Sequence, residues 1–197
     1  MKKTINLLAV VCVAGMMAAC SGTQKDSTSK ADSINGTKDS LDNKQQGTGE
    51  LQISDADAKF AVEAANGGLA EVELGSLAQQ KAVNVEVKDF GKMMVNDHAK
   101  ANMELKALAD SKKITLPDSA GGEEKELKTK LEAKSGKEFD KAYVEAMVND
   151  HKKDIQAFEE ARKKVKYPEM TAFIDKTLPV LKMHLQAILK IQKDVDK

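Results

Sequence analysis

Apolar residues recur every three or four positions over most of the chain after residue 54, and this spacing predicts α-helices. Strand-like alternation of apolar and polar residues is absent, and good helix formers such as Ala, Leu, Lys, Glu and Met are abundant. Ser54 is a suitable N-cap for the first helix. The pattern predicts helices at residues 55–80, 84–111, 123–134, 137–164 and 168–194.

Four of these segments are long, and the charged segment at 123–134 is short. Long amphipathic helices with a connector between the second and third predict an all-α fold, a four-helix bundle with a short extra helix. Pro179 falls inside the last segment, where proline removes a backbone donor and clashes with the preceding turn. We therefore expect a kink or a restart near Thr177.

The first 53 residues have a different composition. Residues 1–19 begin with two lysines, continue as an apolar run and end in small residues, which predicts a signal peptide too short to span a membrane. "MAAC" resembles a bacterial lipobox, so we expect Cys20 to become the lipidated first residue of the mature protein. Residues 20–53 are rich in Ser, Thr, Gly, Asp and Lys, which predicts a disordered tether. Residues 54–197 have the size of one domain.

Charge and cysteine content narrow the class of site. Basic and acidic residues balance at 31 each, so no basic excess favours nucleic acid. The two cysteines are Cys12, inside the predicted signal peptide, and Cys20. The predicted domain therefore has no disulfide and no thiolate metal site.

The stretch "MVNDH" occurs twice, at Met94–His98 and Met147–His151, and it contains two of the three histidines. Helical spacing places these two histidines and His184 on or beside the apolar faces of three different helices. Glu71 falls in the apolar stripe of the first helix. A charged side chain on an inward face is costly unless it is paired or coordinated. These residues therefore require partners inside the protein.

One interpretation is a structural hydrogen-bond network. Asp97 would accept from His151, and Asp150 would accept from His98, so that two reciprocal pairs set the helix register. On this interpretation the polar residues bind no ligand, and the protein acts through its surface.

The other interpretation is a metal site. His98, His151 and His184 with Glu71 would supply four ligands to one transition-metal ion, such as Fe, Cu, Zn or Mn. Asp97 and Asp150 would then orient the imidazole rings from outside the ligand shell. In a copper variant of this site, Met94 and Met147, each one turn before a histidine, would add soft ligands.

The order of these motifs resembles a known family. The segments AANGG, EVELGSLA, MVNDH, FDKAYVEAMVNDH and LPVLKMHL are similar to the bacterial domain of unknown function 4142 family over about residues 55–189. The resemblance implies a ferritin-like helical bundle in an outer-membrane or periplasmic protein. Ferritin-like di-iron proteins use Glu-x-x-His, whereas Val95, Val148 and Leu181 stand three residues before the histidines here. A di-iron site of that type is therefore not expected.

The sequence favours two classes of function over a third. The first is a cell-envelope lipoprotein that binds a transition-metal ion or a small ligand among its interior His, Asp and Glu residues. The second is a non-catalytic envelope protein with a structural polar core. A third class, a redox enzyme that uses a bound metal, is less favoured, because no residue argues for an open coordination position or for turnover. We expect lipid on Cys20 to hold the protein at the outer membrane, with the domain in the periplasm or at the cell surface. A homo-oligomer or an envelope protein partner is compatible with a second apolar stripe on the first helix, at Val62, Ala65, Leu69 and Val72.

Overall fold

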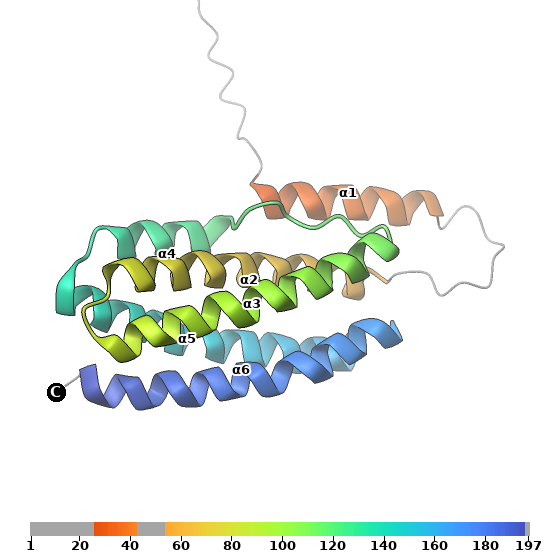
Figure 1. Cartoon of the computed structure of the whole chain (residues 1–197). Helices are drawn as coiled ribbons and strands as arrows, with labels where there is room; N and C mark the ends of the chain where they lie inside the picture. The colour runs from red at the N-terminus through yellow and green to blue at the C-terminus, as the bar shows by residue number, and fades with distance from the viewer. Residues whose placement is uncertain (1–25, 43–53, 196–197) are drawn as a thin grey trace, which may run out of the picture.

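The computed structural model describes residues 26–42 and 54–195, with the backbone alone at residues 38–42. The described residues form six α-helices and no strand, which confirms the all-α prediction. The helices are α1 (Ser27–Asp42), α2 (Asp55–Lys81), α3 (Val85–Ser111), α4 (Gly122–Glu132), α5 (Gly136–Lys164) and α6 (Pro168–Val195) (Figure 1). The predicted signal peptide and Cys20 lie outside the described residues.

The five predicted helices correspond to α2–α6, and their ends agree to within about two residues. Ser54 caps α2 as expected, because its hydroxyl accepts from the Asp57 N–H at 3.2 Å and its own N–H donates to the Asp57 carboxylate at 3.3 Å. Asn84 caps α3 by accepting from the Glu86 N–H at 2.8 Å. α6 continues through Pro179 as one helix. Of the two effects predicted for this proline, a restart near Thr177 is therefore wrong.

Helix α1 is a departure from the predicted tether over residues 20–53. Its sequence is polar, and Ala31 is its buried apolar residue among the side chains described. Polar contacts hold it against the loop after α3. The Asn35 amide donates to the Thr115 carbonyl at 2.9 Å and accepts from the Thr115 N–H at 2.8 Å, and the Ser27 hydroxyl donates to Asp118 at 2.7 Å. Composition alone does not reveal such docking, because it depends on a distant loop.

The four long helices α2, α3, α5 and α6 pack side by side (Figure 1). α2 contacts α3 and α5, and α6 also contacts α3 and α5. α1 and α4 lie against α2. The outward stripe of α2 is therefore partly covered within the chain, with Val62 1% exposed and Ala65 5% exposed.

Two buried aspartates show the direction in which the helices run. Asp57, near the start of α2, accepts from the backbone N–H groups of Lys166 and Tyr167, just before α6, at 3.2 and 3.1 Å. Asp140, near the start of α5, accepts from the N–H groups of Val83 and Asn84, just before α3, at 3.1 and 2.8 Å. α2 and α6 therefore start at one end of the molecule, and α3 and α5 start at the other.

The hydrophobic core is divided into two clusters along the helix axes. One contains Leu74, Phe90, Met94, Tyr143, Met147 and Ile188 among its members. The other contains Phe60, Leu105, Phe158, Phe173 and Leu181 among its members. On each long helix, a His or Glu lies between the residues of one cluster and those of the other, so a polar layer separates the two clusters.

Two glycines allow α2 and α3 to approach closely. A Cβ on Gly75 would lie 2.6 Å from the Gly91 carbonyl oxygen, and a Cβ on Gly91 would lie 2.7 Å from the Gly75 carbonyl oxygen. Only glycine fits at such a backbone-to-backbone contact. The tight α2–α3 pairing brings the polar residues of these helices within reach of each other.

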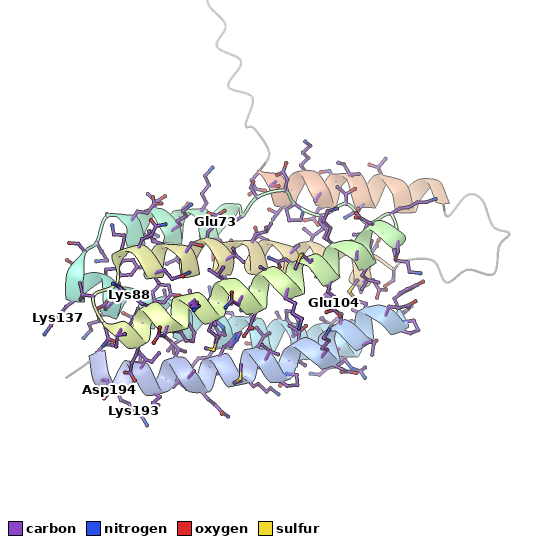
Figure 2. All side chains as sticks on the ribbon, viewed as in Figure 1. Glu73, Lys88, Glu104, Lys137, Lys193 and Asp194 are labelled. Carbon is purple, nitrogen blue, oxygen red and sulfur yellow. The ribbon has the colours of Figure 1, made fainter. Side chains whose placement is uncertain are left out.

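Charged side chains cover the outside of the helices, as the exposed Lys88, Lys137 and Lys193 show (Figure 2). Some of them link neighbouring helices, such as Lys128 with Glu73 at 2.7 Å. Among the described residues, no helix combines the length and the apolar character that a membrane span requires.

Candidate metal centre

Each of the four long helices contributes one side chain to the polar layer at the middle of the molecule. α2 provides Glu71, α3 provides His98, α5 provides His151 and α6 provides His184. All four are buried, with Glu71 1%, His98 5%, and His151 and His184 0% exposed. The ring centroids of the three histidines lie 5.3–6.0 Å apart. The sequence-predicted histidines are thus brought together, although they are 53 and 33 positions apart along the chain.

Each histidine uses one ring nitrogen for a contact with a polar group of the protein. His98 Nδ1 lies 2.6 Å from Glu71 Oε2, and His184 Nε2 lies 2.9 Å from Asp97 Oδ2. His151 Nδ1 lies 3.0 Å from the Met147 carbonyl oxygen, which requires a donating N–H on that nitrogen. These contacts fix the orientation of all three rings.

The remaining nitrogen of each ring is buried and has no hydrogen-bond partner. These atoms are His98 Nε2, His151 Nε2 and His184 Nδ1. One ligand atom from each of the three histidines lies within 4.8 Å of the others. A buried polar atom without a hydrogen-bond partner is costly, and three in one buried layer are unusual in a folded protein. The arrangement leaves a lone pair on a ring nitrogen wherever the opposite nitrogen carries the proton.

Burial keeps the histidines neutral. It lowers the pKa of His98 to about 4, although the Asp97 and Asp150 carboxylates oppose this shift. It lowers the pKa of His151 to about 3, helped by His98 and His184. It also lowers the pKa of His184, although the hydrogen bond that His184 donates to the Asp97 carboxylate opposes this shift. Neutral imidazole is the form that binds metal ions.

Glu71 lies at the junction between the histidines and a second group of carboxylates. Its Oε2 contacts His98, while its Oε1 is 3.5 Å from His151 Nε2 and makes no hydrogen bond. Asp150 and Asp154 on α5 each place one oxygen within 4.8 Å of a Glu71 oxygen and of each other. Burial, and then the Asp150 charge, raises the pKa of Glu71 well above its ordinary value.

The hydrogen-bonded pairs differ from those expected for a structural network. Asp97 pairs with His184 rather than with His151, and His98 pairs with Glu71 rather than with Asp150. The reason is the order of helices around the molecule: α3 packs between α2 and α6, so the partners of its polar residues come from those two helices. Glu71, expected as a fourth ligand, contacts His98 Nδ1 through its Oε2. Asp150, expected to orient a ring, belongs to the carboxylate group.

Sequence reasoning did not identify the roles of three buried polar residues. Asp57 and Asp140 bind loop N–H groups, and Tyr143 has a buried hydroxyl without a partner. Met94 and Met147 are fully buried in the first hydrophobic cluster. An acidic residue near a helix start is an ordinary signal for capping, whereas the cross-helix targets of Asp57 and Asp140 depend on the tertiary fold.

Comparison with known proteins identifies the family. Residues 42–191 match the family described as a domain of unknown function (DUF4142), and the chain belongs to it. No curated protein matches the chain.

Three solved structures share the helical fold. A DUF305 fragment from Deinococcus radiodurans is similar with a TM-score of 0.65 at 7% identity, covering 73% of this chain and 99% of that one. CopM in a silver-bound form has a TM-score of 0.59 at 15% identity, covering 70% and 96%. CopM in a Cu(II)-bound form has a TM-score of 0.57 at 14% identity, covering 73% and 99%.

Proposed function

We propose that this member of the DUF4142 family binds one transition-metal ion through His98, His151 and His184. The observation that carries the proposal is the set of three buried ring nitrogens that have no partner and that belong to three different helices. Their other nitrogens are held by Glu71, Asp97 and the Met147 carbonyl. Metal-binding histidines commonly have such partners, which orient the ring and raise its basicity.

The donor set favours ions that accept imidazole ligands. Three neutral nitrogens suit copper, silver or zinc better than magnesium or calcium, which prefer oxygen. The absence of cysteine from residues 21–197 leaves nitrogen as the softest donor at this position apart from methionine sulfur. CopM, which is similar in fold, has structures that hold silver and Cu(II), so copper and silver are the ions to test first.

The Glu71–His98 contact supports the same assignment. With the proton on His98 Nδ1, the ring donates to an ionised Glu71 and His98 Nε2 keeps its lone pair. A cation at Nε2 favours that arrangement, because it offsets the cost of a buried carboxylate charge. Glu71 therefore acts by orienting His98.

The test is metal analysis of the protein purified without a histidine tag, followed by titration of the chelator-treated protein with Cu(I), Ag(I) and Zn(II). We expect one ion per chain, with affinity reduced on the order of 100-fold or more in His98→Ala, His151→Ala and His184→Ala. Asp97→Asn retains an oxygen acceptor for His184, so we expect a loss of about tenfold. Asn96→Ala and Asn149→Ala are matched controls, because both residues are exposed and each lies in one copy of the repeat.

The alternative function, an envelope protein with a structural polar core, makes a different prediction for the same samples. A folded protein that binds none of the three ions, and whose thermal midpoint does not respond to them, would exclude the metal proposal. The search for function would then move to surface partners.

We also propose that the protein is a lipoprotein of the cell envelope, held at the outer membrane through Cys20. The support is the sequence of residues 1–20, with its basic start, apolar run and lipobox-like end. A Cys20→Ser variant should leave the membrane fraction, and it should no longer incorporate labelled fatty acid. Persistence of the variant in the outer membrane would contradict this anchor.

We assign the four long helices to a four-helix bundle of the ferritin-like type. The support is the order of packing, α2 beside α3 and α5 and α6 beside the same two helices, with α4 in the connection from α3 to α5. An experimental structure with a different helix order would overturn this assignment.

A further inference from the structure

Three carboxylates form a compact group beside the histidines. Glu71, Asp150 and Asp154 each place one oxygen within 4.8 Å of the others. Asp150 and Asp154 lie one turn apart on α5 and share a face, while Glu71 reaches them from α2. Oxygens at this spacing from two helices are arranged as ligands of a single cation would be.

This group has no balancing positive charge in contact with it. Asp150 and Asp154 accept no hydrogen bond and form no ion pair within the part of the chain that the structure describes. Lys153, which lies between them in sequence on α5, places its Nζ 3.8 Å from Glu123. Like charges at short range are stable only with bound protons or a cation.

Two buried oxygens in or near this group, Glu71 Oε1 and the Tyr143 hydroxyl, have no hydrogen-bond partner, although Glu71 Oε1 lies 3.5 Å from His151 Nε2. Glu71 is 1% exposed, and its Oε1 makes no hydrogen bond while its Oε2 contacts His98. The Tyr143 hydroxyl is fully buried without a partner, and its pKa is raised first by burial and then by the charges of Glu71 and Asp150. An unsatisfied carboxylate oxygen at this depth indicates a missing ligand.

The carboxylates also connect the surface with the histidines. Asp150 lines a groove of about 360 Å³ between α4 and α5, whose charged lining consists of four acids and two lysines: Asp150, Glu123, Glu124, Glu126, Lys130 and Lys153. Asp154 lines a small cavity of about 30 Å³ that also contacts Glu71 and His98. An acidic groove attracts cations and raises their local concentration. The carboxylate group therefore borders both the groove, through Asp150, and the cavity beside His98, through Asp154 and Glu71.

We propose that Glu71, Asp150 and Asp154 form a second cation site, which binds a divalent ion with a preference for oxygen ligands and lies on the route to the histidines. Three carboxylates supply hard, anionic ligands, in contrast to the three neutral nitrogens beside them. The two sites therefore select different ions. Glu71 is common to both sites, so the test distinguishes them through residues that belong to one site alone, Asp150 and Asp154 for the second and His184 for the first.

The test is titration of the chelator-treated, full-length protein with Mn²⁺, followed by the loss of the six-line paramagnetic resonance signal of the free ion. We expect one Mn²⁺ per chain. Asp150→Asn and Asp154→Asn keep side-chain size and remove a charged ligand, so each should weaken binding about tenfold or more. Glu145→Gln is the matched control, since Glu145 is an exposed acid on the same helix. Circular dichroism confirms that each variant is folded.

His184→Gln separates the two sites. Because His184 pairs with Asp97, it should leave Mn²⁺ affinity within about threefold while weakening copper binding. Mn²⁺ binding that His184→Gln abolishes, or that both aspartate variants leave intact, would overturn the second site. Folded wild-type protein that binds no Mn²⁺ at millimolar concentration would also overturn the second site. Aspartate-dependent Mn²⁺ binding without any copper binding would support this site and refute the histidine site.

Discussion

Two sets of buried polar side chains differ in how completely they are hydrogen-bonded. Asp57 and Asp140, at the two ends of the molecule, are 0% and 3% exposed, and both oxygens of each accept hydrogen bonds. The central layer is equally buried, yet Glu71 and each of the three histidines have one side-chain atom without a partner there.

This difference in hydrogen bonding indicates how the central polar layer should be interpreted. The same chain satisfies its buried carboxylates fully where they connect helix ends to loops, so incomplete hydrogen bonding is not general in this protein. Unpaired buried groups cost about 1–3 kcal/mol each, and several in one layer would be a large part of the stability of a domain. The end aspartates are therefore structural, and the centre has the properties of a binding site.

The largest effect on stability should come from the end aspartates. Asp57→Ala removes the acceptor for the N–H groups of Lys166, Tyr167 and Ser54, and we expect the free energy of unfolding to fall by about 3 kcal/mol. Asp55→Ala is the control, because Asp55 is exposed in the same helical turn and should cost less than about 1 kcal/mol. Urea denaturation measures both. An equal loss in the two variants would remove the contrast between ends and centre.

A substitution in the central layer should change the stability gained from bound metal more than the stability of the metal-free protein. His151→Leu removes an unpaired nitrogen and introduces an apolar side chain into the buried layer, so we expect the metal-free stability to change by less than about 1 kcal/mol. At a copper concentration 100 times the dissociation constant, the wild type should gain about 2.7 kcal/mol, and His151→Leu should gain almost nothing. Thermal unfolding with and without copper measures this. A variant that loses several kcal/mol without metal would make His151 structural.

The raised pKa of Asp150 predicts that the difference in stability between the wild type and Asp150→Asn depends on pH. The pKa of Asp150 is raised to about 6 from 3.8, first by burial and then by Glu124, so the folded protein binds this proton more tightly than the unfolded chain. The wild type therefore gains stability as pH falls through 6, and the gain is complete below about 3.8. Asp150→Asn has no such proton. We expect it to be more stable than the wild type by about 1–3 kcal/mol above pH 7, with the advantage lost near pH 4.

Urea denaturation of wild type and Asp150→Asn in parallel from pH 4 to 8 checks this sign. The comparison removes most of the opposite contribution of the histidines, whose lowered pKa values make both proteins less stable below pH 6.5. A difference between the two proteins that does not vary with pH would show that Asp150 is not buried beside other carboxylates.

The smallest effect should come from a polar contact at the surface. Asn35→Ala removes the two hydrogen bonds that join α1 to Thr115, and we expect a loss of about 1 kcal/mol or less. Faster amide exchange should be confined to α1 and to residues 112–121, because few apolar contacts hold this helix. Asp32→Ala is the control on an exposed face of α1. Exchange that quickens equally in α2 would mean that α1 belongs to the same cooperative unit.

The sequence predicted which histidines belong to the candidate site, but it did not predict their hydrogen-bonded partners. Helical spacing placed His98, His151 and His184 on inward faces, and the structure brings the three together. The pairing of Asp97 with His184, and of His98 with Glu71, differs from the expected pairs. Spacing along one helix says which way a side chain faces, but not which helix it faces.

The sequence by itself determined the extents of the five helices α2–α6, the cap at Ser54 and the inward position of the polar residues, because these depend on local periodicity and on contacts a few residues apart. The tertiary structure alone decided three features. It docked the polar helix α1 on a distant loop, aimed Asp57 and Asp140 at backbone groups more than 50 residues away, and grouped Glu71 with Asp150 and Asp154. Each depends on the order and direction of helices around a common core, which no local pattern encodes.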